Sequence, residues 1–129
     1  MTVARKIMAP AVNVETKPFW EAANQSKLLL KRCLSCNEVH YYPRALCPFC
    51  FGETQWEESK GQGAIYTYSV MRRAPVPYAI AYVTLDEGPT IMTNIVDCDF
   101  DSLRIGQRVR LTYQPSESGQ QVAMFAPTG

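Results

Sequence analysis

The sequence feature that most constrains the fold is the stretch Arg32–Gly52, RCLSCNEVHYYPRALCPFCFG, which holds four of the chain's five cysteines in two Cys-x-x-Cys pairs. A Cys-x-x-Cys pair on a tight turn directs both sulfurs to one point, and two such turns supply the four thiolates that a tetrahedral zinc ion accepts. The spacing therefore predicts that one metal ion binds four cysteines, Cys33, Cys36, Cys47 and Cys50.

The residues around the two pairs suit such turns. Asn37 follows the first pair and tolerates a left-handed backbone, and Gly52 lies two residues past the second pair. Leu28, Leu29 and Leu30 predict a strand that leads into Cys33. A segment of this size cannot bury much core alone, so we expect the metal to stabilise it.

The cellular setting that we expect favours a metal over disulfides. The N-terminal sequence has no uninterrupted apolar core of the secretory kind, and no apolar stretch approaches the roughly 18 residues of a membrane span. We therefore expect a cytoplasmic protein with no membrane partner, whose thiols stay reduced. An odd number of cysteines also prevents full pairing within one chain.

Two other chemistries use similar cysteines. A thioredoxin-like redox motif occurs singly and opens a helix in a βαβ unit, whereas neither pair here precedes a helical pattern. An iron site of the rubredoxin type would use the same four sulfurs and stays open as the alternative to zinc. With four protein ligands the ion has no open position, so we expect a structural metal that performs no hydrolysis.

The remaining reactive side chains form no catalytic set. His40, the only histidine, lies between the pairs, but four cysteines already complete a metal shell, so we interpret it as a packing or surface residue. Cys98 is interpreted as a small buried hydrophobe, because no histidine nearby could activate it. Asp97, Asp99 and Asp101 share one loop without the ligand pattern of an EF-hand, which indicates a solvated loop. We expect no catalysis by this chain alone.

The segment before the first pair predicts a short helix. Thr16 is a candidate N-cap and Pro18 suits the first turn. One face of the helix would hold Phe19, Ala22, Ala23 and Ser26. A helix this short needs something to dock on, and large aromatic side chains are frequent interface anchors. Phe19 and Trp20 are therefore predicted to contact a partner protein, with packing on their own chain as the alternative.

After Gly61 the pattern changes to the period of two that is typical of strands. The predicted strands are 64–72, 78–85, 90–96, 108–114 and QVAMFAP, and a one-turn helix or loop covers 99–107. In the first strand Ile65, Thr67, Ser69 and Met71 alternate with Tyr66, Tyr68 and Val70. Five short antiparallel strands with one longer connection favour a small closed barrel such as the OB-fold.

These elements predict a mainly β protein in three parts. A tail with a short N-terminal helix occupies residues 1–27, a zinc ribbon residues 28–60, and a five-stranded OB-fold barrel residues 61–129. The boundary before the barrel is expected at EESKGQG, residues 57–63, where charged residues and glycines interrupt the strand pattern.

Several separate signatures, in this order, carry a resemblance to a known family: KPFWEAANQSKLLLKRCLSC, YYPRALCPFC, GQGAIYTYSVMRR, PYAIAYVTLDEGPTIMTNIV and LRIGQRVRLTY. The chain resembles the zinc-ribbon/OB-fold family first described as domain of unknown function 35 (DUF35). The resemblance implies a role in acyl-CoA metabolism, as a non-catalytic accessory subunit of a thiolase, a thiolase-like aldolase or acyltransferase, or a hydratase. It also implies the same order of helix, zinc ribbon and barrel, with a zinc ribbon of the rubredoxin-like type.

Two arginines are candidates for contact with CoA. Arg72 and Arg73 end the first predicted barrel strand, and the arginine fork suits phosphate groups. We predict that they bind CoA phosphates, with a solvated strand end as the alternative. The family often has His-Arg-Pro near this position, whereas this chain has Arg72-Arg73-Ala74-Pro75, so no role of that histidine is carried over.

A nucleic-acid-binding protein is the second functional hypothesis, since zinc ribbons and OB-folds both bind nucleic acids. Tyr66, Tyr68, Tyr78 and Tyr82 could form a stacking platform. Residues 61–129, however, hold five arginines and no lysine against six acidic residues, a net charge of −1, while residues 1–60 hold eight basic and six acidic residues. Because binding to a polyanion depends on neutralising phosphates, this charge disfavours a nucleic-acid partner.

Overall fold

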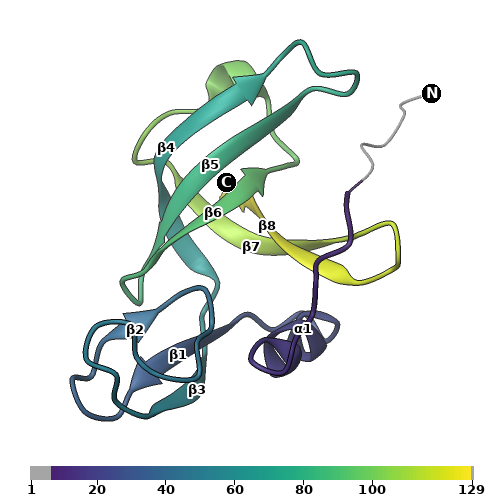
Figure 1. The fold of residues 1–129 in the computed structure, drawn as a ribbon. Coiled ribbons are helices and arrows are strands. Elements are labelled where there is room, and N and C mark those ends of the chain that lie inside the picture. The colour runs from purple at the N-terminus through teal and green to yellow at the C-terminus, as the bar shows by residue number, and fades with distance from the viewer. Residues whose placement is uncertain (1–6, 129) are drawn as a thin grey trace.

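The computed structural model describes residues 7–128 and contains one short helix, a three-stranded sheet and a closed five-stranded barrel (Figure 1). The elements are α1 (Lys17–Ala23), β1 (Leu29–Cys33), β2 (Val39–His40), β3 (Thr54–Glu58), β4 (Gln62–Met71), β5 (Tyr78–Leu85), β6 (Thr90–Ile95), η1 (Phe100–Ser102), β7 (Arg108–Pro115) and β8 (Gln121–Pro127). The predicted fold class is confirmed. Residues 1–6 of the predicted N-terminal tail lie outside the described residues.

The helix α1 begins where the sequence predicts and ends earlier. Thr16 is the N-cap residue, and its hydroxyl bonds with Asn13, whose N–H donates to Thr16 Oγ1 over 3.1 Å. Ser26 adopts a left-handed φ of 61°, so the chain turns before it. Phe19 and Ala23 are buried, whereas Ser26 is exposed and lies past the helix, which corrects the predicted face.

The ribbon sheet has the strand order β2-β1-β3 with antiparallel pairing. β3 was not predicted, because Trp56 is its only large apolar residue and polar or charged residues surround it. In β3 the ring of Trp56 lies under Lys31, whose Nζ is 4.1 Å from the ring centroid. Next to it, Arg32 donates from Nε and Nη2 to the Glu57 carboxylate over 2.9 and 3.0 Å. These cross-strand pairs stabilise the sheet from its two faces.

The barrel closes in the order β4-β5-β6-β8-β7, and one of its five pairs is parallel. Strands β6 and β8 run in the same direction and meet at the register pair Ile95 and Phe125. The prediction of antiparallel strands is therefore wrong for this pair. A closed ring with an odd number of strands cannot alternate direction throughout, so one pair has to be parallel.

A bulge in β4 changes which side chains face the core. The register with β5 shifts between Ile65 and Thr67, and Tyr66 at the bulge is 67% exposed. Ile65 is buried, whereas Thr67 is exposed, so the two residues predicted to share a face lie on opposite faces. After the bulge Tyr68 packs inward and its hydroxyl donates to the Leu103 carbonyl over 2.8 Å. An extra residue in one strand has this effect on side-chain direction.

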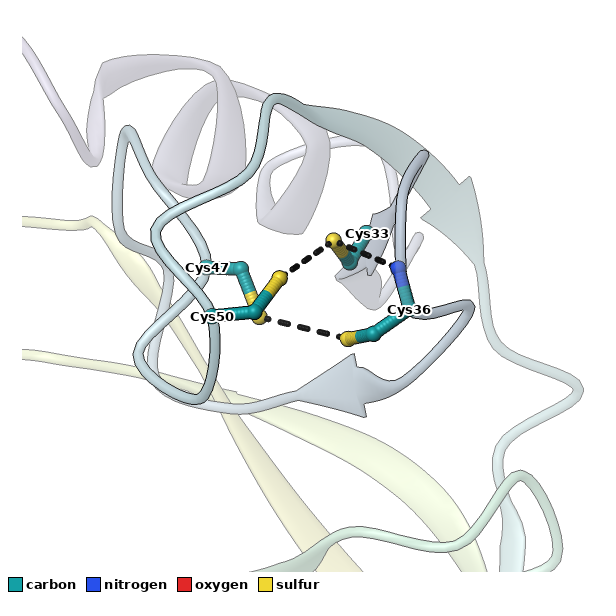
Figure 2. A group of neighbouring side chains, drawn as sticks. All are labelled: Cys33, Cys36, Cys47 and Cys50. Carbon is teal, nitrogen blue, oxygen red and sulfur yellow. Dashed lines mark hydrogen bonds between the residues drawn. The ribbon is translucent and has the colours of Figure 1, made fainter.

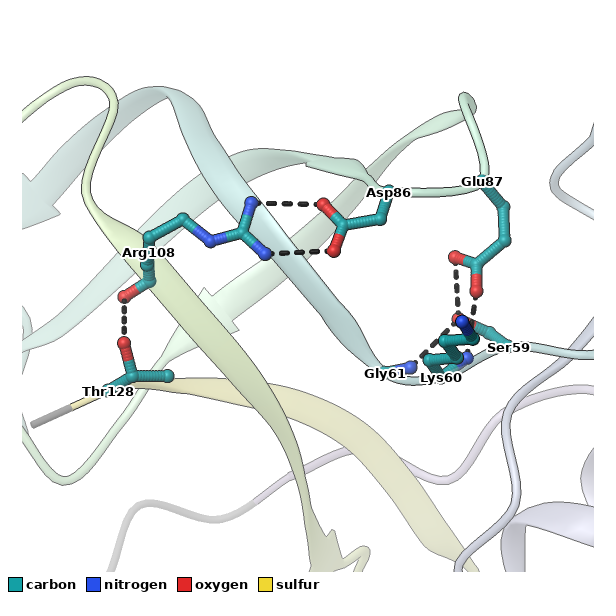
Figure 3. Close-up of polar contacts among 7 residues, drawn as sticks. All are labelled: Ser59, Lys60, Gly61, Asp86, Glu87, Arg108 and Thr128. Carbon is teal, nitrogen blue, oxygen red and sulfur yellow. Dashed lines mark hydrogen bonds and ion pairs between the residues drawn. The ribbon is translucent and has the colours of Figure 1, made fainter.

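A short polar junction connects the ribbon to the barrel (Figure 3). The Glu87 carboxylate, in the turn between β5 and β6, accepts bonds from Ser59 Oγ over 2.9 Å and from the Lys60 N–H over 2.8 Å. Ser59 Oγ in turn accepts from the Gly61 N–H over 3.0 Å. One hydrophobic core, which includes Phe19 from α1 and Phe125 from β8, continues across this junction. The ribbon therefore packs on the barrel through both polar and apolar contacts.

Candidate functional site

Cys33, Cys36, Cys47 and Cys50 lie in two turns whose sulfurs face one another (Figure 2). All four sulfurs lie within 4.8 Å of one another, with 3.4 Å between those of Cys33 and Cys50 and 3.7 Å between those of Cys36 and Cys47. An ion held tetrahedrally by thiolates at about 2.3 Å requires sulfur–sulfur separations of about 3.8 Å. The donor set and its spacing fit such an ion.

Backbone N–H groups in both turns point at sulfur. The N–H groups of Ser35 and Cys36 each lie 3.3 Å from Cys33 Sγ, and the Phe49 N–H lies 3.4 Å from Cys47 Sγ. The bond from the Cys36 N–H is the largest cause that lowers the pKa of the Cys33 thiol to about 6. Since the thiolate is the form that binds metals, the two bonds to Cys33 favour the metal-binding form of that side chain.

The turns depend on unusual backbone positions. Asn37 has a φ of 65°, which confirms the left-handed conformation expected of it, and Phe51 has a φ of 62°. Gly52 is required for close approach, because a Cβ there would lie 2.8 Å from Ser35 Oγ and 3.0 Å from Cys33 Sγ. Gly52 in the second turn thus determines how near the first turn can come.

His40 lies outside the cysteine cluster and packs in the ribbon, as predicted. It is 4% exposed, and its Nε2 accepts the Arg44 N–H over 3.2 Å. Burial lowers the pKa of His40, and the positive charges of Lys31 and Arg44 lower it further. The histidine is therefore a neutral acceptor that holds the loop between the two cysteine pairs.

The other titratable groups that the sequence analysis considered have structural roles. Cys98 is half-buried against the core, and burial raises the pKa of its thiol. The Asp99 carboxylate caps η1 by accepting from the Asp101 N–H and the Ser102 hydroxyl, each over 3.1 Å. Within residues 7–128, the paired cysteines are the one group of three or more His, Cys, Asp or Glu side chains arranged to hold a metal ion.

The two arginines predicted to contact CoA lie far from the cysteines. Arg72 and Arg73 follow β4 at the tip of the β4–β5 hairpin, at the opposite end of the molecule from the ribbon (Figure 1). Both side chains are exposed, and Arg72 Nη2 lies 2.7 Å from Asp101 Oδ1. The structure therefore separates the candidate metal centre from the basic hairpin tip.

The predicted interface residues Phe19 and Trp20 lie in an aromatic cluster within the chain. The Phe19 ring is 5.0 Å from that of Trp20 and 5.4 Å from that of Tyr42, and the Trp20 Nε1 donates to the Tyr42 hydroxyl over 2.7 Å. Phe19 is 2% exposed, so it offers no surface to a partner, which corrects that half of the prediction. Trp20 keeps part of its surface exposed.

An apolar groove that the sequence does not predict lies between α1, β6 and β8 and has a volume of about 510 Å³. Its walls come from separate segments, including Trp20 in α1, Met92 in β6 and Met124 in β8. No local pattern in the sequence joins these positions, so tertiary structure alone brings them together.

Two family models match the chain in succession. Residues 20–57 match the family described as ChsH2, rubredoxin-like zinc ribbon domain, and residues 56–114 match ChsH2, C-terminal OB-fold domain. Together they cover the ribbon and most of the barrel.

Individual relatives extend this similarity. The chain is 36% identical over 109 residues to a DUF35 domain-containing scaffold protein of Methanothermobacter thermautotrophicus, a match that covers 78% of this chain and 82% of the relative. It is 33% identical over 125 residues to a probable enoyl-CoA hydratase alpha subunit of Thermomonospora curvata, which covers 92% of this chain and 39% of that protein. The chain thus spans about two fifths of the length of the latter relative.

One solved structure superposes closely. A chain of the Ltp2-ChsH2(DUF35) aldolase aligns with a TM-score of 0.83 at 31% sequence identity, and the match covers 92% of this chain and 98% of that one. The fold of this chain therefore recurs over nearly the whole of that chain.

Proposed function

The chain belongs to the DUF35 family of zinc-ribbon/OB-fold scaffold proteins, and from this membership we propose that it is a non-catalytic subunit that binds and completes a thiolase-like acyl-CoA enzyme. Such an enzyme would be a thiolase, an aldolase or an acyltransferase. The observation that carries the proposal is the superposition on a whole chain of an aldolase named as an assembly with a DUF35 protein. The relative named as a hydratase subunit supports acyl-CoA as the substrate class.

The chemistry of the described residues supports a scaffold role. The four clustered sulfurs can saturate one ion, His40 is buried and occupied by a backbone donor, and Asp99 caps a helical turn. The alternative of nucleic-acid binding gains no support, because residues 61–129, which hold the barrel, carry a net charge of −1.

We assign the metal as a structural Zn²⁺ held by the four cysteine thiolates. A bound zinc ion would cross-link the two turns and contribute folding free energy, about 10–16 kcal/mol in small zinc peptides. Metal analysis of the purified chain should find one zinc per chain. One iron per chain, with the visible absorption of an iron–thiolate site, would establish the rubredoxin-type alternative instead.

Co-expression tests the scaffold role. The thiolase-like enzyme alone, this chain alone and the two together are assayed for thiolysis, aldol cleavage and acyl transfer on CoA esters. The complex should be far more active than the enzyme alone, and this chain alone should be inactive. Turnover by the isolated chain, or equal activity of the enzyme with and without it, would contradict the proposal.

The basic hairpin tip is proposed to contact CoA phosphates. Replacing both Arg72 and Arg73 with alanine should weaken the affinity of the complex for CoA esters without impairing assembly. The Arg72–Asp101 pair is exposed and contributes little to stability, so the fold should tolerate the change. Alanine at the exposed Arg104 and Arg110 is the matched control. Equal affinities in the two double variants would reject this contact.

The exposed part of Trp20 is proposed to contact the partner enzyme. Trp20→Ala should reduce the amount of enzyme that co-purifies with this chain. Trp56→Ala is the control, because Trp56 is the chain's other tryptophan and lies in the ribbon sheet under Lys31. An unchanged yield with Trp20→Ala, or an equal loss in both variants, would remove Trp20 from the interface.

A further inference from the structure

The apolar groove exists because two barrel strands diverge. Strands β6 and β8 share the register pair Ile95 and Phe125, while their other edges pair with β5 and β7. Away from that pair the two strands separate, and α1 packs beside β8 below the barrel (Figure 1). Phe19 and Trp20 of α1 therefore line a hollow that the barrel alone would leave open.

The groove uses the outward face of β5 and β6. Residues Tyr78 and Ile80 of β5 and Met92 and Asn94 of β6 line it, whereas the alternate residues of both strands are buried. These are the second and third strands of the barrel, whose outer face is the ligand-binding face of OB-folds. Met92 is 62% exposed at this face, so the groove is open to solvent.

The lining is uncharged. Among the described residues that line the groove none is Asp, Glu, Lys or Arg, and most are aromatic, aliphatic or methionine. The volume of about 510 Å³ lies within the range of roughly 300–1,000 Å³ that is usual for small-molecule sites. A surface of this kind favours an apolar ligand and disfavours a polyanion or a cation.

At one end the uncharged groove adjoins a hollow with basic side chains. Tyr78 lines both this groove and a neighbouring hollow whose lining includes Arg72 and Arg73. The apolar groove thus adjoins, at Tyr78, a hollow lined by two arginines, of which Arg72 also pairs with Asp101 at the surface. This distribution complements an amphipathic anion with an apolar tail and phosphate groups at its head.

We propose that the groove between α1, β6 and β8 binds the acyl group of a CoA thioester whose phosphates face Arg72 and Arg73. The inference rests on the proposed function, because that function makes acyl-CoA the ligand class. It goes further by locating the acyl group on this chain rather than wholly on the partner enzyme.

Binding of acyl chains of different length to the full 129-residue chain tests the proposal. Calorimetry with CoA and with butanoyl-, octanoyl- and dodecanoyl-CoA, below their micelle concentrations, measures each dissociation constant. Burial of each methylene should tighten binding by up to about fourfold until the groove is full. Equal dissociation constants for butanoyl- and dodecanoyl-CoA would overturn the proposal.

Two kinds of variant distinguish binding of the acyl chain from binding of the CoA phosphates. Met92→Glu places a carboxylate in the groove and should reduce dodecanoyl-CoA affinity at least about tenfold, while CoA affinity stays unchanged. Ile105→Glu is the matched control, because Ile105 is 69% exposed and does not line the groove. Alanine at both Arg72 and Arg73 should weaken all chain lengths by one common factor. If Met92→Glu has no greater effect than Ile105→Glu, the groove is not the acyl site.

Tryptophan fluorescence locates the bound chain independently. In a Trp56→Phe variant the emission comes from Trp20, and a dodecanoyl-CoA brominated on its acyl chain should quench it. In a Trp20→Phe variant the emission comes from Trp56 in the ribbon and should be quenched much less. Equal quenching in the two variants would overturn the proposal.

Failure of this inference is distinguishable from failure of the proposed function. Co-purification with an active enzyme, but no dependence of affinity on acyl length, would refute the groove site and leave the scaffold role intact. If Met92→Glu abolished co-purification and left dodecanoyl-CoA affinity unchanged, the groove would be a protein interface and the acyl assignment would be wrong.

Discussion

Gly52 and His40 support the cysteine turns, although neither is among the candidate metal ligands. Gly52 permits the close packing of the second turn against Cys33 and Ser35, and His40 holds the intervening loop through the Arg44 N–H. The side chain of one residue and the lack of a side chain at another therefore set the geometry around the sulfurs.

Gly52→Ala should weaken zinc binding. The added Cβ would meet Ser35 Oγ at 2.8 Å and Cys33 Sγ at 3.0 Å, and overpacking of this kind costs about 1–3 kcal/mol. We expect a loss of zinc affinity of roughly fivefold to a hundredfold, measured by competition with a chromogenic chelator. Gly119→Ala is the control, because its φ of 90° strains alanine but nothing lies within 4 Å of the new Cβ. Unchanged zinc affinity in Gly52→Ala would contradict the role of this contact.

His40→Gln should make the free energy of unfolding fall less as the pH is lowered. The folded-state pKa of His40 is below its ordinary value of 6.5, so below about pH 6.5 the unfolded chain takes up the proton more readily. The neutral imidazole therefore makes its full contribution to the free energy of unfolding above about pH 6.5. That contribution is lost as the pH falls through the folded-state pKa.

Urea unfolding of the zinc-loaded protein at about pH 7.5 and about pH 5.5 measures this effect. The original chain should lose more stability over this interval than His40→Gln, since the cysteines contribute equally to both proteins. Identical losses would show that His40 titrates alike in the folded and unfolded states.

At the scale of elements, the bulge in β4 decides which side chains enter the barrel. Tyr66 is the extra residue, and it places Ile65 inside and Thr67 outside. The bulge also increases local strand twist, which a small barrel needs in order to close.

Alanine substitutions on either side of the bulge test this assignment. Ile65→Ala removes a buried side chain and should cost about 2–5 kcal/mol of unfolding free energy. Thr67→Ala is a change at an exposed position and should stay within about 0.5 kcal/mol. Chemical denaturation of the zinc-loaded protein measures both. Similar large losses for the two variants would indicate the unbulged alternation, in which both residues face the core.

At the scale of the whole molecule, the ribbon and the barrel differ in what closes them. The barrel completes a ring of strands by itself, whereas the ribbon sheet carries two cysteine turns whose ends meet at the sulfurs. The Glu87 junction joins the two parts, and the hydrophobic core that includes Phe19 continues from one to the other.

Metal removal should therefore loosen the two parts unequally. After zinc is extracted with a chelator under reducing conditions, amide hydrogen exchange should accelerate strongly in residues 29–58 and much less in residues 62–127, because metal binding supplies folding free energy to the ribbon. Exchange by mass spectrometry on the zinc-loaded and zinc-free protein measures this. A uniform acceleration across the chain would show that the barrel depends on the metal as well.

The candidate metal centre is predictable from the sequence alone, because its donors are close in sequence and their spacing is itself the signal. The same holds for the start of α1 at Thr16, the left-handed backbone at Asn37 and the period-two strands of the barrel. Each of these depends on the residues immediately around it, so local stereochemistry decides it.

Other features depend on contacts between distant segments. Phe19 is buried because Tyr41, Tyr42 and the core surround it, and Ile65 and Thr67 are separated by a register shift against β5. The parallel pairing of β6 and β8 and the groove beside it follow from closing five strands into a ring. Local patterns specify which residues form strands and turns, but ring closure and burial against remote neighbours specify which of their surfaces stay open to a ligand.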